Sequence, residues 1–149
     1  MLKLSRKTLL ALEAVIDIAF NARPEPVQAK EITARQGVPQ RYLEQVMQQL
    51  VRAGILKGVR GPRGGYRLAR ERRRISVGDV VRVAESIEDE EERSVPRSEL
   101  GQRIVAPFVQ TLQDELMVRL DSVSIEELCQ RARHAGVDLG ADASADFTI

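Results

Sequence analysis

The sequence predicts a mainly α-helical fold with one small β-hairpin and a long helix towards the C-terminus. Aromatic residues make up only 3% of the 149 residues, so the core must be built from aliphatic side chains, which suits helix packing. Apolar residues recur at the three- and four-residue spacing of helices in several segments. Between these segments lies RGPRGGYRL (60–68), whose glycines and proline are typical of a tight turn between two strands.

The first predicted helix runs from about Ser5 to Asn21. Ser5 is a candidate N-cap, and apolar residues cover most sides of the segment, as expected of a buried helix. The N-terminus resembles a signal peptide in hydropathy, but Glu13 and Asp17 interrupt its apolar stretch. No run of about 18 apolar residues exists in the chain, so we expect no membrane span and a cytoplasmic protein.

Two further helices predict a helix-turn-helix. The first covers about Ala29 to Gln36 and ends at Gly37, because glycine readily adopts the left-handed conformation that follows many helices. Pro39 fits the first turn of the second helix, where its missing N–H group costs nothing. The second helix carries one apolar stripe, which comprises Leu43, Val46, Met47, Leu50 and Val51.

The opposite face of this second helix indicates base recognition. It carries Arg41, Gln45, Gln48, Gln49 and Arg52. Glutamine offers a donor and an acceptor that match adenine, and arginine matches guanine. An ordinary solvated helix face is the alternative, and the helical hairpin alone does not decide against it.

The next segment predicts a β-hairpin, with strands over 55–60 and 65–69 joined by a turn over 61–65. A glycine-rich loop that binds a nucleotide would join a strand to a helix, whereas this loop joins two strands. A hairpin directly after a helix-turn-helix is a wing, whose arginines can contact phosphates or a narrow minor groove. These arginines are Arg60, Arg63 and, at the base, Arg67. A basic extension, read as non-specific phosphate contacts or solvated charge, comprises Arg70, Arg72, Arg73 and Arg74.

The distribution of charge favours a nucleic-acid partner for the N-terminal half. The net charge is only +1, but residues 1–75 hold 16 Lys/Arg against 6 Asp/Glu, a balance of +10. Residues 76–149 hold 7 against 16, a balance of −9. This asymmetry is expected when one half of a chain meets phosphate, and two unevenly charged solvated surfaces are the alternative.

The C-terminal half predicts helices that assemble with a second copy. Residues 77–86 are predicted to form a short helix. The acidic EDEEE run (88–92) is interpreted as a solvated linker. Its carboxylates are not expected to form a metal site, because nothing fixes their geometry. A long amphipathic helix follows over about 104–120 and needs a partner helix as cover. Its expected interface residues are Val105, Phe108, Val109, Leu112, Leu116 and Leu120. Ser124 caps a last helix, which ends near Gly136.

These segments give a domain plan. It consists of a winged helix-turn-helix domain (1–86), an acidic linker (87–103), dimerisation helices (104–136) and a flexible tail (137–149).

The sequence resembles the Rrf-two family of bacterial transcription regulators over roughly residues 1–120. The resemblance rests on LSRKTLLALEAVIDIA, EITARQGVPQRYLEQVMQQLVRAGIL, VRGPRGGYRLAR and ISVGDVVRVAE. It implies a dimeric winged helix-turn-helix repressor or activator, with the second helix in a major groove and the wing in a flanking minor groove. By position it assigns base and backbone reading to Gln40, Arg41, Tyr42 and Glu44, and wing contacts to Arg60, Gly61, Gly64 and Gly65.

The resemblance does not extend to an iron–sulfur cofactor. Cluster-binding members carry three cysteines between the fourth helix and the long helix, where this chain has IEDEEERSVPRSELGQR. A cluster held by one chain needs about four ligands, mostly thiolates, so we expect no cofactor. The single cysteine, Cys129, suits a reducing compartment and is interpreted as buried and structural, with a redox switch as the alternative. His134 is interpreted as a basic residue near the C-terminal end of the last helix, where it interacts favourably with the helix dipole.

The predicted function is therefore a homodimeric regulator that binds specific sequences in double-stranded DNA, subject to an effector or protein partner. An enzyme is not expected, because no nucleophile–base or paired-carboxylate spacing stands out. The alternative is a winged-helix module that binds a protein and does not read DNA.

Overall fold

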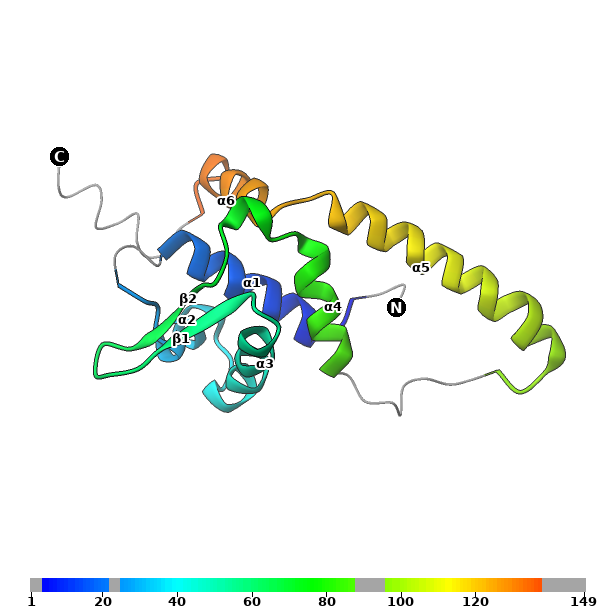
Figure 1. Cartoon of the computed structure of the whole chain (residues 1–149), viewed down its shortest axis with the longest axis horizontal. Helices are drawn as coiled ribbons and strands as arrows, with labels where there is room; N and C mark the ends of the chain where they lie inside the picture. The colour runs from blue at the N-terminus through cyan, green and yellow to red at the C-terminus, as the bar shows by residue number, and fades with distance from the viewer. Residues whose placement is uncertain (1–3, 22–24, 88–95, 138–149) are drawn as a thin grey trace.

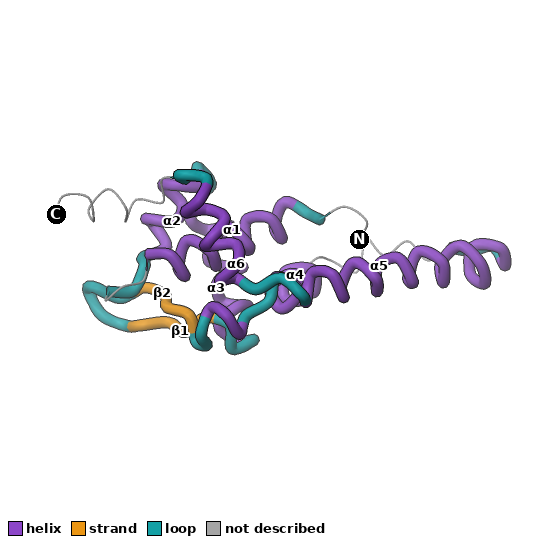
Figure 2. Tube along the Cα trace, turned by 90° about the horizontal axis from the view of Figure 1, so that it is seen from above, coloured by secondary structure: helices purple, strands orange, loops and turns teal. Residues whose placement is uncertain are grey.

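The computed structural model describes residues 4–21, 25–87 and 96–137, and its mainly helical architecture with one hairpin is the one predicted. The N-terminal elements are α1 (Arg6–Asn21), α2 (Ala29–Gln36), α3 (Gln40–Arg52), β1 (Leu56–Val59) and β2 (Gly65–Leu68). They are followed by η1 (Arg72–Arg74), α4 (Val77–Ile87), η3 (Gly101–Val105), α5 (Ala106–Asp121) and α6 (Ile125–His134). In Figures 1 and 2 the hairpin and α5 extend from opposite ends of the helical core.

Helix α1 lies at the centre of this core. It contacts α2, α3, α4, α6 and β2, and Ala11, Ala14, Val15 and Ile18 are fully buried. The two alanines have little volume, so neighbouring helices can approach the α1 backbone closely. Ser5 caps the helix as predicted, because the Thr8 N–H donates to Ser5 Oγ at 3.2 Å.

Helices α2 and α3 form the predicted helix-turn-helix. Gly37 ends α2 in the left-handed conformation, with φ of 69°. The predicted position of Pro39 in the first helical turn is wrong by one residue. Pro39 is the extended N-cap residue of α3, with φ −63° and ψ 138°, and its ring offers no oxygen to cap the helix.

Strands β1 and β2 pair antiparallel, with Leu56 opposite Leu68 and Val59 opposite Gly65. The isolated residue Val27, in the segment between α1 and α2, extends this ladder. Its N–H donates to Tyr66 O at 3.0 Å, and the Tyr66 N–H donates to Val27 O at 2.7 Å. The hairpin is therefore anchored to the N-terminal part of the fold on its β2 side.

The C-terminal half differs from its prediction at one boundary. Helical structure begins at Glu99, within the segment expected as a linker, and continues through the π-helical η3 into α5. The EDEEE run (88–92) and the C-terminal tail beyond 137 lie outside the described residues. In the described part of the chain, no helix combines the length and apolar character that crossing a membrane requires.

Helices α4, α5 and α6 meet near the start of α4. A Cβ on Gly78 would overlap Asp121 Oδ1, so a larger residue here would displace the Asp121 side chain at the end of α5. Arg82 donates to Asp121, and this hydrogen bond lowers the pKa of that carboxyl. Helix α6 then folds back onto α1, with its first turn capped as predicted by Ser124 Oγ, which accepts from the Glu127 N–H at 3.1 Å.

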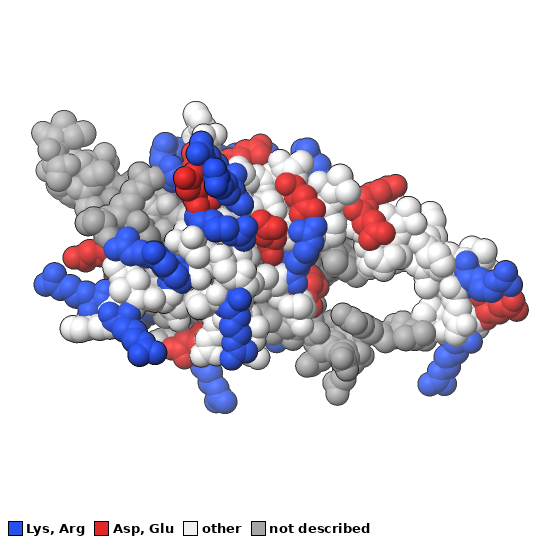
Figure 3. Space-filling model, viewed as in Figure 1, with Lys and Arg blue, Asp and Glu red and all other residues white. Residues whose placement is uncertain are grey.

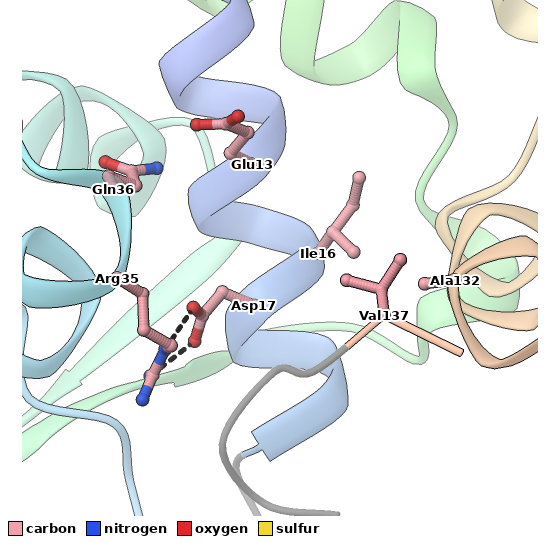
Figure 4. A pocket seen from close by; sticks show the side chains of 7 residues that line it. All are labelled: Glu13, Ile16, Asp17, Arg35, Gln36, Ala132 and Val137. Carbon is pink, nitrogen blue, oxygen red and sulfur yellow. Dashed lines mark hydrogen bonds and ion pairs between the residues drawn. The ribbon is translucent and has the colours of Figure 1, made fainter. Parts of the chain in front are cut away.

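A buried ion pair fixes α2 against α1 (Figure 4). Arg35 donates to Asp17 through Nε at 2.6 Å and Nη2 at 2.7 Å, and Asn21 Nδ2 donates to the same carboxylate at 3.0 Å. Asp17 is only 4% exposed. The hydrogen bonds to Asp17 raise the pKa of Arg35. A carboxylate this deep in the protein depends on its partner, because an unpaired buried charge is strongly destabilising.

We expect Arg35→Met to lower the free energy of unfolding by about 2 kcal/mol, because it leaves the buried Asp17 carboxylate without its cation. The estimate is below the range for fully buried pairs because Arg35 is partly exposed. Urea unfolding measures the change. Arg131→Met is the matched control, because it removes an exposed ion pair with Glu127 and should cost about 0.5 kcal/mol or less. Equal losses in both variants would contradict the structural role of the buried pair.

Candidate nucleic-acid interface

Helix α3 presents a continuous polar face to solvent. Its apolar stripe is buried as predicted at Leu43, Val46, Met47 and Leu50, and Val51 is half-buried. The burial of one side of an amphipathic helix determines which residues face outwards. The exposed residues are Gln40, Arg41, Glu44, Gln45, Gln48 and Arg52, all of which the sequence analysis selected.

The first turns of α3 are organised by local contacts. Gln40 Nε2 donates to Glu44 Oε1 at 2.9 Å, which holds both side chains on the same side of the helix. Tyr42 is half-buried, and the Lys7 ammonium of α1 lies 5.9 Å from the centre of its ring. Tyr42 is therefore part of the surface that supports the helix, and Lys7 adds a cation beside it that the sequence analysis did not select.

The wing carries its arginines at an exposed tip. Arg60, Gly61 and Arg63 are exposed, and Gly61 adopts φ of 116°, a conformation that favours glycine. Arg63 is 86% exposed and lies 3.7 Å from Glu25, an ion pair that solvent weakens. Arg67 is half-buried at the base of β2, opposite Lys57 of β1. The tip therefore presents two exposed cations, while Arg67 is half-buried within the hairpin.

Two glycines let the wing close tightly. A Cβ on Gly64 would overlap Val59 O across the turn, and a Cβ on Gly65 would overlap Val27 O. Gly64 N–H also donates to Gly61 O at 2.9 Å. These two glycines thus have packing roles, which are distinct from the DNA contacts that the resemblance implied for them.

Tyr66 of the wing lies within the electrostatic influence of Glu44 of α3. Burial raises the pKa of Tyr66, and the negative charge of Glu44 raises it further. The Tyr66 phenol therefore stays protonated around neutral pH.

Cations gather around these two elements. Figure 3 shows many Lys and Arg side chains at the end of the molecule that carries the wing and α3, with others over α6 and at the far end of the α5 arm. The basic extension divides into two parts. Arg70, Arg73 and Arg74 are exposed, whereas Arg72 is turned inwards to an ion pair with Glu126 of α6. Arg72 is therefore a packing residue, and the reading of it as a phosphate contact is wrong for this conformation.

Helix α5 exposes the apolar stripe predicted for dimerisation. No side chain of this fully described helix is buried. Phe108 is 63% exposed, Val105 is also exposed, and Val109, Leu112, Leu116 and Leu120 are half-buried. Met117 and Leu120 pack against the core, so the uncovered surface lies towards the N-terminal end of α5 and includes Ile104 of η3.

Cys129 and His134 lie on α6, away from the wing and α3. Cys129 is 1% exposed, and burial raises the pKa of its thiol despite the nearby Arg72 guanidinium. Both observations favour the structural interpretation over the redox one, because reactive thiols are accessible and have lowered pKa values. His134 is exposed in the last turn of α6. Among the described residues, no group of three or more His, Cys, Asp or Glu side chains could hold a metal ion.

Three comparisons with known proteins agree with this geometry. A family model described as "Rrf2: Iron-dependent Transcriptional regulator" matches residues 4–131. The HTH-type transcriptional regulator IscR of Aliivibrio salmonicida is 35% identical over 129 residues, which cover 85% of this chain and 77% of that protein. IscR of Vibrio atlanticus is 40% identical over 88 residues, 59% of this chain, so this chain matches only about half (51%) of that relative's length.

Solved structures show the same fold. T. potens IscR matches with a TM-score of 0.72 and 33% identity, over 91% of this chain and 92% of that one. CymR (YrzC), the global cysteine regulator of B. subtilis, matches with a TM-score of 0.67 and 30% identity, over 88% of this chain and 98% of that one. The family and these relatives are transcriptional regulators and not enzymes, which confirms the expected class of protein.

We expect Gly65→Ala to detach the wing from Val27 and to lower the free energy of unfolding by about 1–3 kcal/mol, because its Cβ overlaps the Val27 carbonyl. Amide exchange of Tyr66, whose N–H bonds to that carbonyl, should accelerate. Gly58→Ala on β1 is the control, since nothing lies within 4 Å of its Cβ position. Unchanged protection of the Tyr66 amide in Gly65→Ala would show that the Val27 contact does not hold the wing.

Proposed function

Because the chain belongs to the Rrf2 family of transcriptional regulators, we propose that it binds specific DNA sequences as a homodimer, without an iron–sulfur cluster. The observation that carries the proposal is the exposed face of α3, rich in glutamine and arginine, beside a wing with an arginine tip. The proposal includes a cytoplasmic location, because such a regulator must reach the DNA.

Helix α3 is proposed to enter a major groove, which admits one helix and presents a distinct pattern for each base pair. Gln45 and Gln48 on its exposed face suit adenine, and Arg41 and Arg52 suit guanine or phosphate. Glu44 can accept from the amino group of cytosine, and its hydrogen bond with Gln40 orients it before DNA arrives. Base contacts of this kind would supply the sequence preference.

The wing is proposed to reach an adjacent minor groove. Arg60 and Arg63 project from the exposed tip, and a narrow minor groove attracts such side chains through its negative potential. The base pattern in that groove is degenerate, so these arginines would read width and charge. Their contribution would be affinity for many sequences, with the exposed Glu25–Arg63 ion pair giving way to phosphate at little cost.

A second copy of the chain is the proposed cover for the apolar stripe of α5. The exposed Ile104, Val105 and Phe108 project from a helix that extends away from its own domain (Figure 1). Large exposed apolar patches of this kind mark interaction surfaces. A two-fold pairing of α5 with its mate would bury the same stripe on both chains.

The donor set does not fit an iron–sulfur cluster. The chain has a single cysteine, and Cys129 is buried in α6 with a raised thiol pKa. Among the described residues no cluster of metal-ligating side chains offers an alternative. We therefore propose that the signal sensed by this regulator differs from the iron dependence named in the family description.

We expect Arg60→Ala and Arg63→Ala to weaken binding across many DNA sequences and to flatten the salt dependence by about one unit each. Gln45→Ala or Gln48→Ala should instead relax the preference at one base pair by about 1–3 kcal/mol if the contact is bidentate. Titrations against the best operator, its single-base variants and random DNA at several salt concentrations measure both effects.

Arg131→Ala on α6 is the control for the wing variants, because it removes an arginine from an element remote from the wing. If the wing variants keep both the DNA affinity and its salt dependence unchanged, the hairpin is a turn that does not contact DNA. The alternative, a module that binds a protein and does not read DNA, would then be favoured.

We expect Phe108→Glu to raise the dimer dissociation constant by at least about 100-fold, because a charge would enter the centre of the apolar stripe. Sedimentation at micromolar concentration should show two-chain species for the unaltered protein and single chains for the variant. Gln110→Glu introduces the same charge on the opposite side of α5 and should leave the dimer intact. A monomeric unaltered protein would refute this part of the proposal.

Protein purified without oxygen should show no stoichiometric visible absorbance and no matched iron and sulfide, because the chain lacks the thiolates for a cluster. If iron and sulfide are found, Cys129→Ser decides whether ligation across two chains through Cys129 explains them. A stoichiometric cluster would overturn the proposal in either case, and the substitution only identifies the ligand.

A further inference from the structure

A cavity of about 380 Å³ lies between α1, α2 and the C-terminal end of α6 (Figure 4). Its volume is within the range of small-molecule sites, which is about 300–1,000 Å³. None of the residues proposed to contact DNA lines it. A molecule bound here would therefore not compete with DNA for the same atoms.

The cavity has one polar side and one apolar side. Glu13, Ile16 and Asp17 of α1 form its floor at helical spacing, and Arg35 of α2 closes the polar side. Ala132 of α6 and Val137 beyond it face Ile16 and form the apolar side. This combination of an apolar wall with a few polar groups is typical of small-molecule sites.

The charges of the lining leave one carboxylate uncompensated. Asp17 and Arg35 neutralise each other through the two hydrogen bonds already described. Among the described residues, Glu13 has no such cation, and its side chain is exposed at the cavity. The lining therefore attracts a cation and repels an anion.

We infer that this cavity binds a small monocationic amine with an apolar group. The ammonium would lie against the Glu13 carboxylate, and the apolar group would pack between Ile16, Ala132 and Val137. The negative charge of Glu13 favours a cationic ligand. The burial of the ligand's apolar group supplies further binding free energy.

The consequence for DNA binding rests on the proposed function. Arg35 and Gln36 are the last residues of α2, directly before the turn into α3. Arg35 bonds to Asp17, and Gln36 Nε2 donates to Leu10 O at 3.1 Å, so these two residues attach the helix-turn-helix to α1. A ligand in the cavity contacts this attachment. The ligand changes DNA affinity if it binds more tightly to one orientation of α2 relative to α1 than to another.

Calorimetric titration of the full chain, without DNA, tests the site. The probes are benzylamine, benzyl alcohol and phenylacetate, which share a ring and differ in charge. Benzylamine should bind most tightly and phenylacetate least. Glu13→Gln should weaken benzylamine by about fivefold and leave benzyl alcohol unchanged, because only the cation uses the carboxylate.

Ala132→Phe should abolish binding of both benzylamine and benzyl alcohol by filling the cavity. Ala135→Phe is the matched control, since the same substitution lies outside the lining and should preserve binding. Equal binding of benzylamine and phenylacetate, or unchanged binding in Ala132→Phe, would overturn the inference. If Ala132→Phe does not fold, the Glu13→Gln comparison still decides.

The regulatory consequence is tested by DNA titration with and without saturating benzylamine. An altered operator affinity, lost in Ala132→Phe, which should not bind benzylamine, is the expected result. An unaltered affinity would refute the link to DNA while leaving the site in place. A protein that binds benzylamine but no DNA at all would instead refute the proposed function.

Discussion

The burial of α1 is the constraint on which the rest of the structure depends. This helix contacts four other helices and β2, and its small residues Ala11 and Ala14 allow that number of neighbours. Because α1 is enclosed, the charged group that it buries needs a partner from another element. Asp17 finds this partner in Arg35 of α2, so the same packing that forms the core also fixes the helix-turn-helix.

The position of the candidate interface follows from this packing. The apolar stripe of α3 is buried in the core, so the opposite, polar face of the helix faces solvent. The stripe comprises Leu43, Val46, Met47 and Leu50. The hairpin is held beside it by the backbone bonds between Val27 and Tyr66. Recognition surfaces on rigid elements are more precise than surfaces on loops. Here the residues proposed to read bases lie on the helix α3, while the arginines of the wing tip lie in an exposed turn.

The sequence was informative wherever structure is determined by nearby residues. The stripe of α3, the caps at Ser5 and Ser124, the left-handed Gly37 and the hairpin all have local signals, and each appears at its predicted place. The outward residues of α3 follow from the same periodicity. Their assignment to DNA came from their chemistry and from the family resemblance.

Contacts between distant segments could not be predicted in this way. Val27 joins the hairpin although a single valine between a proline and a glutamine carries no strand signal. Asp17 and Arg35 are 18 positions apart, and Arg72 turns inwards only because α6 brings Glu126 next to it. The start of the long helix at Glu99 was missed because the acidic residues before it, with Pro96 and Gly101, are typical of a linker.

The projecting helix α5 has a geometric consequence for the operator. In the proposed dimer it sets the separation and the relative rotation of the two α3 helices, and these helices must meet DNA on one face of the duplex, one turn or about 34 Å apart. Each residue added to a helix advances it by about 1.5 Å and turns it by about 100°. In the proposed dimer, the length of the 16-residue α5 would therefore constrain the spacing of the operator half-sites.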